Sequence, residues 1–358
     1  MHKFNYDWRL ADGYPAPGIK PNGCTVFSTF SCGGGSSMGY KLAGYNVIGA
    51  EDIDPKMQAL YEKNHHPKYY FLDGVKTLKD REDLPEELYH LDILDGSPPC
   101  SNFSMAGNRE DDWGKEKKFR EGQAKQVLDT LFFDFIDLAA KLKPKVVIAE
   151  NVKGLLIGAA KEYVTRILSD FDKAGYAVSF YLLNSSTMGV PQARNRVFFI
   201  AIRKDLLPKL QNLQYDLFGG SPILKMEFDE EPIPYKEIEE KEGNANAWGI
   251  YPGVKPYWEK IEPGRSCADV HPKGHFFQEL KLHPDKPLPT LRAGSNSYYH
   301  YKDERKLFDM EITHGGSFPT DYDYNKQKPI YVVGMSVPPV MMAQVSNKVY
   351  EQVLSRLK

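Results

Sequence analysis

The sequence has little of what marks several large classes of protein. Its 358 residues include only four cysteines, which are scattered, so a disulfide-stabilised scaffold is excluded. No CxxC pair or Cys/His cluster has the spacing of a zinc site, and no metal is expected. No run of about 18 apolar residues is present, which excludes an ordinary membrane-spanning helix.

Neither sign of charge predominates. The chain carries 46 Lys and Arg against 48 Asp and Glu, a net charge of −2. This balance argues against a protein that coats nucleic acid non-specifically, but it allows a local basic cleft. The first residues lack the basic-then-apolar pattern of a secretory signal, so we expect a cytoplasmic protein that does not associate with membranes.

Short apolar runs alternate with helix-like stretches to about residue 203. We expect strands at 25–30, 47–51, 91–95, 146–150, 178–183 and 197–202, and helices at 38–43, 55–63, 124–142, 161–174 and 340–357. The helix at 124–142 is the clearest, because Val127, Leu131, Phe135 and Leu138 define one apolar face. The alternation predicts an α/β fold with a doubly wound, mostly parallel, Rossmann-like sheet.

The composition changes after about residue 204. Residues 216–303 are rich in Pro, Gly, Tyr and charge, and their weak periodicity indicates an irregular inserted domain. A linker is the alternative, but Trp248, Tyr251 and Trp258 belong to an aromatic content too high for disorder. We therefore expect three segments, at 1–203, 204–303 and 304–358, the last returning to the first domain.

A glycine-rich turn, residues 30–35 (FSCGGG), follows the first expected strand. Glycines let the backbone approach a ligand at the carboxyl end of a strand. Asp52 ends the next strand 17 residues after Gly35, near where an acid would bind a ribose hydroxyl. The turn is not GxGxxG, so a dinucleotide is less expected and an adenosine-containing ligand without a pyrophosphate stays open. The alternative is a tight strand–helix turn with an acid that faces the helix.

A second motif, Gly96–Ser104 (GSPPCSNFS), follows the strand at 91–95. Pro98 and Pro99 stiffen the segment and fix the direction of the Cys100 side chain. A buried structural cysteine is the common alternative. A polar, proline-locked loop at a strand end is where α/β active sites lie, which favours a nucleophile.

Two charged motifs complete the set. Glu150 and Asn151 stand at the carboxyl end of the fourth expected strand, where a charge is rarely buried without a partner. Arg194 and Arg196, within Gln192–Arg196, lie two residues apart and so share a face of an extended chain, which suits carboxylate or phosphate recognition. The alternatives are a helix cap and a single surface ion pair.

In this order the motifs resemble those of the DNA cytosine-5 methyltransferase family of bacteria and phages. The resemblance covers about 25–203 and 304–350, and it continues in Arg305–Leu307 with Glu311, Ser317–Pro319 and Gly334–Pro339. It implies a methyltransferase sheet with a small inserted target recognition domain at 204–303.

The resemblance also implies a site for S-adenosyl-L-methionine. The residues implied to form it are Phe30, Ser31, Cys32, Gly33, Gly35, Asp52, Ile53, Asp73, Gly74, Pro99, Ser336 and Val337. Asp52 would hold the ribose, and Ile53 and Asp73 would contact the adenine. Cys32 replaces a glycine of the family and Met335 an asparagine. Backbone contacts of the turn survive the first change only if the φ angle of Cys32 is negative.

The catalytic residues implied are Cys100, Glu150, Arg194 and Arg196. The Cys100 thiolate would add to carbon 6 of a cytosine swung out of the duplex, and Glu150 would supply a proton or hydrogen bond at nitrogen 3. Arg194 would hold the carbonyl oxygen of the base, and Arg196 would position Glu150 or a phosphate. The stretch after Cys100, to about Trp113, would close over the base.

The implied partner is double-stranded DNA, with a cognate restriction endonuclease as a further candidate partner. We expect a monomer, because one chain supplies every motif. A transfer RNA cytosine-5 methyltransferase is the main alternative, and the inserted aromatic domain favours DNA over it. A catalytically silent DNA-binding module is disfavoured by the intact Cys100, Glu150 and Arg194, and a nucleotide-dependent oxidoreductase is the weakest alternative.

Overall fold

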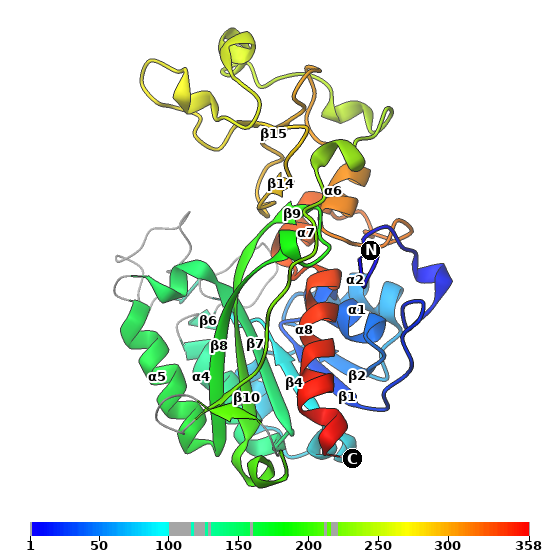
Figure 1. The fold of residues 1–358 in the computed structure, drawn as a ribbon, viewed down its shortest axis with the longest axis vertical. Helices are drawn as coiled ribbons and strands as arrows, with labels where there is room; N and C mark the ends of the chain where they lie inside the picture. Colours follow the sequence, from blue (N-terminus) through cyan, green and yellow to red (C-terminus); the bar gives the residue numbers. More distant parts are fainter. Residues whose placement is uncertain are drawn as a thin grey trace. The chain divides into compact units, whose positions relative to one another are not determined.

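A computed structural model of the chain (Figure 1) describes residues 2–99, 116–117, 126–127, 130–157, 160–210, 213–215 and 221–357. The chain divides into two compact units. The sheet unit comprises Tyr14–Leu183, Asn195–Glu227 and Met342–Lys358, and the irregular unit comprises Met1–Gly13, Asn184–Arg194 and Phe228–Met341. These bounds differ from the functional segments expected at 1–203, 204–303 and 304–358, and those assignments stay predictions.

A seven-stranded sheet forms the centre of the sheet unit, in the order β3-β2-β1-β4-β7-β10-β8. Its strands are β1 (Thr25–Thr29), β2 (Asn46–Glu51), β3 (Tyr69–Phe71), β4 (Ile93–Gly96), β7 (Val146–Val152), β8 (Tyr176–Asn184) and β10 (Asn195–Arg203). The neighbours from β3 to β7 are parallel, and β10 pairs antiparallel with β7. The mostly parallel α/β sheet predicted from the alternation is therefore confirmed.

Helices cover the sheet because successive residues of each strand point to opposite faces. The helices of the sheet are α1 (Gly35–Leu42), α2 (Pro55–His65), α3 (Val75–Asp80), α4 (Leu131–Leu142), α5 (Ala160–Lys173) and α8 (Pro339–Gln352). Phe27, Leu94 and Phe199 point to one face, where they pack in a single apolar core with α3, α4 and α5. Ser28 and Asp95 point to the other, where the Asp95 carboxyl accepts a hydrogen bond from Tyr40 of α1.

The C-terminal helix returns to the sheet unit. The hydroxyl of Tyr45, which precedes β2, donates to the carbonyl of Ser346 on α8 at 2.8 Å. The rings of Tyr45 and Tyr350 also meet edge to face, with centroids 6.3 Å apart. The last segment of the chain is thus anchored to the connection between α1 and β2.

The helix expected at 124–142 is too long. Gln126–Val127 form the short strand β6, which pairs antiparallel with β5 (Glu116–Lys117), and α4 begins only at Leu131. The prediction that Val127 lies on the helix face is therefore wrong, because its backbone pairs with Glu116 instead. β3 and α3 were not predicted, because they have only three and six residues and are too short to show a period.

The irregular unit has short strands and 3-10 turns around a small apolar core. That core consists of Val254, Trp258, Ile261, Cys267 and Tyr299. Its helices are α6 (Asp309–Gly315) and α7 (Pro329–Met335).

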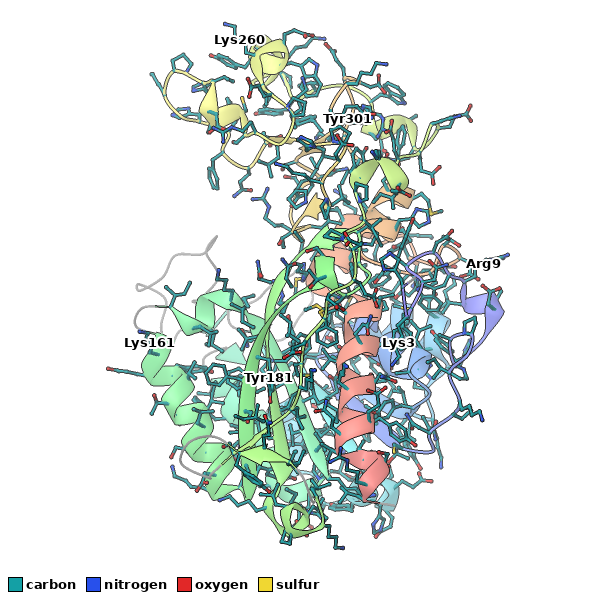
Figure 2. The ribbon with its side chains drawn as sticks, in the orientation of Figure 1. Lys3, Arg9, Lys161, Tyr181, Lys260 and Tyr301 are labelled. Carbon is teal, nitrogen blue, oxygen red and sulfur yellow. The ribbon has the colours of Figure 1, made fainter. Side chains whose placement is uncertain are left out.

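Buried polar contacts hold this unit together. Arg305 donates to both carboxylate oxygens of Glu311, at 2.8 and 2.9 Å, and Tyr235 donates to the same carboxylate at 2.9 Å. Tyr301, labelled in Figure 2, donates to Glu239 at 3.0 Å. No helix within the described ranges combines the length and apolarity needed to cross a bilayer.

Candidate functional site

The glycine-rich turn after β1 takes a strained path. The φ angles of Phe30, Cys32 and Gly34 are +52°, +46° and +75°, and left-handed backbone costs a residue with a side chain about 1–2 kcal/mol. Backbone contacts of the turn were expected to survive the replacement of glycine by Cys32 only if the φ angle of Cys32 were negative. The angle is positive, so this condition is not met. Carboxylates at the end of β2 hold the turn. The Phe30 amide donates to Glu51 at 3.1 Å, and the Cys32 amide donates to Asp52 at 2.8 Å.

Asp52 lies where the sequence analysis expected an acid that holds a ligand. One oxygen accepts from Cys32 and the other accepts from the Asp54 amide at 2.9 Å. Burial raises the pKa of Asp52 to about 6, and the amides of Asp54, Cys32 and Ile53 oppose this shift by favouring the charged form. The carboxylate is thus held directly beneath the turn.

His65 of α2 supports the turn from behind, and the sequence analysis did not identify it. Its Nε2 lies 3.4 Å from the carbonyl of Gly33, and its ring stacks on Tyr61 with centroids 4.2 Å apart. A Cβ atom at Gly34 would lie 2.1 Å from the same Nε2. Burial, followed by the charge of Lys41, lowers the pKa of His65 well below its usual value. A side chain at position 34 is therefore excluded while His65 keeps its place.

Two buried hydroxyl groups beside the turn are available to a ligand. Apart from their interaction with each other, the Ser31 and Tyr70 hydroxyls make no well-formed hydrogen bond to any residue in the described parts of the chain. Burial raises the pKa of Tyr70, as does the charge of Asp52, while nearby Ser31 lowers it. Buried hydroxyls next to a carboxylate fit a ligand rich in hydroxyl and amino groups, as S-adenosylmethionine is.

Three further residues expected at the cofactor follow the ends of β2 and β3. A Cβ atom built on Gly74 would lie 3.6 Å from the Ile53 side chain, in ordinary contact. Asp73 accepts from the Gly74 amide at 3.2 Å, and Arg81 approaches its carboxylate at 3.7 Å. Ile53, Asp73 and Gly74 therefore line neighbouring turns of the same sheet edge.

The segment after β4 leads toward the expected nucleophile. Cys100 and the stretch to Trp113 lie outside the described residues, whereas Pro98 and Pro99 lie inside them. The buried Asn151 side chain donates to the carbonyl of Pro98 at 3.0 Å, and its oxygen accepts from the Val152 amide at 2.9 Å. Asn151 thus ties the end of β7 to the segment that precedes Cys100.

Glu150 and Arg196 form a buried ion pair across β7 and β10. Arg196 Nε lies 2.7 Å from Glu150 Oε1, and the side chains are 12 % and 10 % exposed. The antiparallel register pairs Glu150 with Phe198, which places Arg196 two residues along, on the same face. Burial lowers the pKa of Arg196, and the neighbouring Glu150 opposes that shift. The expectation that Arg196 positions Glu150 agrees with this geometry.

Arg194 has different neighbours, within the irregular unit. Its guanidinium donates to the carbonyls of Leu291, Gly334 and Ser336 at 3.0, 2.9 and 3.1 Å. The two guanidinium groups therefore have different partners, although their spacing suggested a pair. The Ser336 hydroxyl donates to Val332 at 2.8 Å, and Val337 is buried. Ser336 and Val337 belong to the irregular unit and the glycine-rich turn to the sheet unit, so their predicted cofactor contacts stay predictions.

Comparisons with known proteins agree with this arrangement. Residues 24–351 match the sequence profile of the family described as C-5 cytosine-specific DNA methylase. The Type II methyltransferase M.FnuDI of Fusobacterium nucleatum is 33% identical over 235 residues, which are 66% of this chain and 58% of the relative. The Type II methyltransferase M.NgoPII of Neisseria gonorrhoeae is 36% identical over 220 residues, or 61% of this chain and 56% of the relative. The matched regions thus span little more than half of these two relatives.

A solved structure shares the fold. The Dnmt2 methyltransferase of S. pombe aligns with a TM-score of 0.61 over 92% of this chain and 98% of its own, at 15% identity. At that identity the likeness concerns the fold alone. The profile match over most of the chain goes further, and it means that this chain belongs to the C-5 cytosine-specific DNA methylase family.

Proposed function

We propose that this protein transfers a methyl group from S-adenosylmethionine to carbon 5 of a flipped-out cytosine in a specific sequence of double-stranded DNA. The observation that carries the proposal is the buried Glu150–Arg196 pair at the carboxyl end of β7. Asn151, the next residue, anchors the segment that leads to Cys100. The proposed proton donor and the segment that leads to the candidate nucleophile thus both adjoin the carboxyl end of β7.

The chemistry requires each of these groups. Carbon 5 of cytosine is a weak nucleophile until the Cys100 thiolate adds to carbon 6, which moves an electron pair toward nitrogen 3. Glu150 supplies a proton or hydrogen bond there. Carbon 5 would then take the methyl group as the bond from that methyl to the sulfonium sulfur breaks, and nitrogen 3 would return its proton to Glu150. The proton on carbon 5 would leave to water, and its electron pair would restore the ring double bond as the carbon 6–sulfur bond breaks to release the thiolate. The chemistry that bound S-adenosylmethionine supplies is an electrophilic methyl group.

Arg196 is better placed than Arg194 to assist the base. It is the arginine beside Glu150, and a positive charge there favours electron density developing on the carbonyl oxygen of the pyrimidine. The Arg194 guanidinium already donates to three carbonyls of the irregular unit. We therefore assign the base contact to Arg196 and a supporting role to Arg194.

Residues of the turn and the adjacent strand ends would hold the cofactor. In this proposal they are Phe30, Ser31, Cys32, Gly33, Gly35, Asp52, Ile53, Asp73, Gly74 and Pro99, with Ser336 and Val337 contributed by the other unit. The buried Ser31 hydroxyl and the Asp52 carboxylate support it most directly. Residues 204–303 would read the target DNA.

Labelled methyl transfer tests the function. Purified protein with methyl-labelled S-adenosylmethionine is expected to label duplex DNA and leave transfer RNA unlabelled. Cys100→Ala should abolish labelling, and 5-fluorocytosine DNA should trap a covalent complex with the unaltered protein only. Labelling of transfer RNA alone would favour the alternative substrate, and undiminished labelling by Cys100→Ala would contradict the nucleophile.

Cell-based sequencing tests the target and the context. DNA from cells that express the chain, converted so that 5-methylcytosine is distinguished from cytosine, should show one short methylated motif. A cognate restriction endonuclease is part of the proposal, because the relatives are named Type II methyltransferases. In that case the methylated DNA should resist an endonuclease that cuts the same motif. Expression in the cytoplasm and a monomeric state complete the proposal.

A further inference from the structure

Asp95 is a buried carboxyl group that the proposed chemistry does not use. It is the third residue of β4 and only 1% exposed. Ser28 of β1 donates to one of its oxygens at 2.7 Å, and Tyr40 of α1 donates to the other at 3.1 Å. The Thr29 hydroxyl donates to the Asp95 backbone carbonyl at 2.9 Å. The residue is thus bonded to two other elements of the sheet unit.

The partners of Asp95 are hydroxyl groups and not cations. No lysine, arginine or histidine in the described ranges forms an ion pair with it. Burial raises the pKa of Asp95 to about 7, and the nearby charge of Glu150 raises it further. The hydroxyls of Ser28, Tyr40 and Ser36 oppose the shift. Burial of a carboxyl group is costly unless it is hydrogen-bonded, and the two hydroxyls supply those bonds here.

The position of Asp95 in the sheet places it on the same face as Ser28 of β1 and Glu150 of β7. Ser28, Asp95 and Ile148 occupy one row across β1, β4 and β7, so they share a face. Glu150 is two residues beyond Ile148 and therefore lies on that same face, one step closer to the carboxyl edge. The polar groups that face Asp95 are Ser28 on β1, Ser36 and Tyr40 on α1, Tyr61 on α2 and Glu150 on β7.

Helix α1 begins at Gly35, the last residue of the glycine-rich turn, while β4 ends four residues before Cys100. The buried Asp95 side chain therefore links α1, the helix that follows the glycine-rich turn, to β4, the strand that precedes Cys100 in the sequence. We propose that Asp95 is a positioning residue for methyl transfer, which holds the cofactor turn in register with the described residues 97–99 that lead to Cys100. This inference rests on the proposed function.

Asp92 offers a matched control at the other end of the same strand. It directly precedes β4, is 8% exposed, and accepts from the Thr25 amide of β1 at 2.7 Å. It also pairs with Lys145 at 2.7 Å. Asp92 and Asp95 therefore both join β4 to β1, but only Asp95 is bonded to α1.

The experiment compares D95N with D92N in the full chain. Cofactor affinity is measured by calorimetry with S-adenosylmethionine, and kcat and KM are measured for methylation of duplex DNA between pH 6 and 8.5. D95N should weaken cofactor binding at least fivefold, lower kcat/KM at least tenfold and change the shape of the pH profile. D92N should leave affinity and kcat within twofold and the profile unchanged, even where it lowers the unfolding temperature.

Tyr40→Phe tests the same link without altering the carboxyl group. Y40F should weaken cofactor affinity and lower kcat, as D95N does, but by a smaller factor. The double variant D95N/Y40F should have an affinity and a kcat within about twofold of those of D95N. If D95N does not fold, judged by circular dichroism, Y40F carries the test alone against D92N.

Indistinguishable kinetics, cofactor affinity and pH profiles for D95N and D92N, or a Y40F variant that behaves as the unaltered protein, would overturn the role of Asp95. An unaltered protein that binds S-adenosylmethionine but methylates no DNA would instead contradict the proposed function. In that case weaker cofactor binding by D95N alone would still support the link to the turn, so the two failures are distinguishable.

Discussion

At the residue scale, Cys32 holds a backbone conformation that suits glycine. Its φ is +46°. Its amide nonetheless donates to one oxygen of the Asp52 carboxylate, and the Asp54 amide donates to the other. The strain is therefore retained at the point where the turn meets the acid. Strained backbone at such a place is common in ligand sites, because the surrounding hydrogen bonds determine it.

Cys32→Gly should relieve this strain. We expect the free energy of unfolding to rise by about 0.5–1 kcal/mol, because relief of about 1–2 kcal/mol exceeds the added chain entropy of glycine. The lost contact between Cys32 Sγ and Met57 Sδ, 3.6 Å apart, reduces the gain. Urea unfolding measures the change. Gly34→Ala is the control and should destabilise the protein, since its Cβ would overlap His65. A loss of more than 1 kcal/mol in Cys32→Gly would refute the interpretation.

The Glu150–Arg196 pair makes a second prediction at this scale. Arg196→Gln leaves the carboxylate buried without its cation, and we expect a loss of about 3 kcal/mol in unfolding free energy. The double variant Arg196→Gln/Glu150→Gln should lose less than the sum of the two single changes, by at least about 1 kcal/mol. Urea unfolding of all four proteins forms the cycle. Additive losses would mean that the two side chains are not coupled.

At the scale of elements, most of the proposed site lies at the ends of strands, and most of these strands were predictable from the sequence. Val146–Ala149 is a continuous apolar run, and Thr25–Thr29 is made mostly of β-branched and aromatic residues, which favour strands. That Arg194 and Arg196 have different partners was not predictable from their spacing. It depends on the antiparallel register of β10 on β7, for which a two-residue spacing carries no signal. His65 and Asp95 were missed for a similar reason, because their partners come from distant elements.

Asn151 makes a prediction about the connection between β7 and the segment before Cys100. Asn151→Ala should cost about 1–2 kcal/mol, because the Pro98 carbonyl and the Val152 amide lose a buried partner. It should also lower kcat at least tenfold, since small displacements of a nucleophile slow the reaction strongly. Urea unfolding and steady-state methylation measure the two effects.

Asn22→Ala is the matched control for Asn151. Asn22 is also buried, donates to the Ala43 carbonyl at 3.1 Å and accepts from the Cys24 amide at 2.9 Å, but it precedes β1 at the opposite end of the sheet. A similar loss of stability without a change in kcat is expected. Equal kcat values for the two variants would show that Asn151 does not position the segment.

At the scale of the whole molecule, buried acids predict how stability depends on pH. The pKa of Asp95 is about 7 in the folded chain and about 3.9 in an unfolded one, so the folded state binds the proton more tightly. Its contribution is fully present below about pH 4 and is lost as pH rises toward and through 7. Asp52, with a pKa of about 6, acts in the same direction over a narrower range.

D95N should therefore gain stability relative to the unaltered protein as pH rises. We expect the difference in unfolding free energy between them to change by about 2 kcal/mol between pH 5 and pH 8, in favour of the variant. Urea unfolding of both proteins at the two pH values measures it, and other titrating groups cancel in the comparison. A difference that is constant with pH would show that Asp95 is ionised throughout this range.

Segments of the two compact units alternate along the chain. The backbone passes from one to the other at five places, after residues 13, 183, 194, 227 and 341. A chimera that borrows the irregular unit of a relative must therefore import three separate pieces, and a single exchanged block covering 204–303 would leave 184–194 packed against foreign sequence.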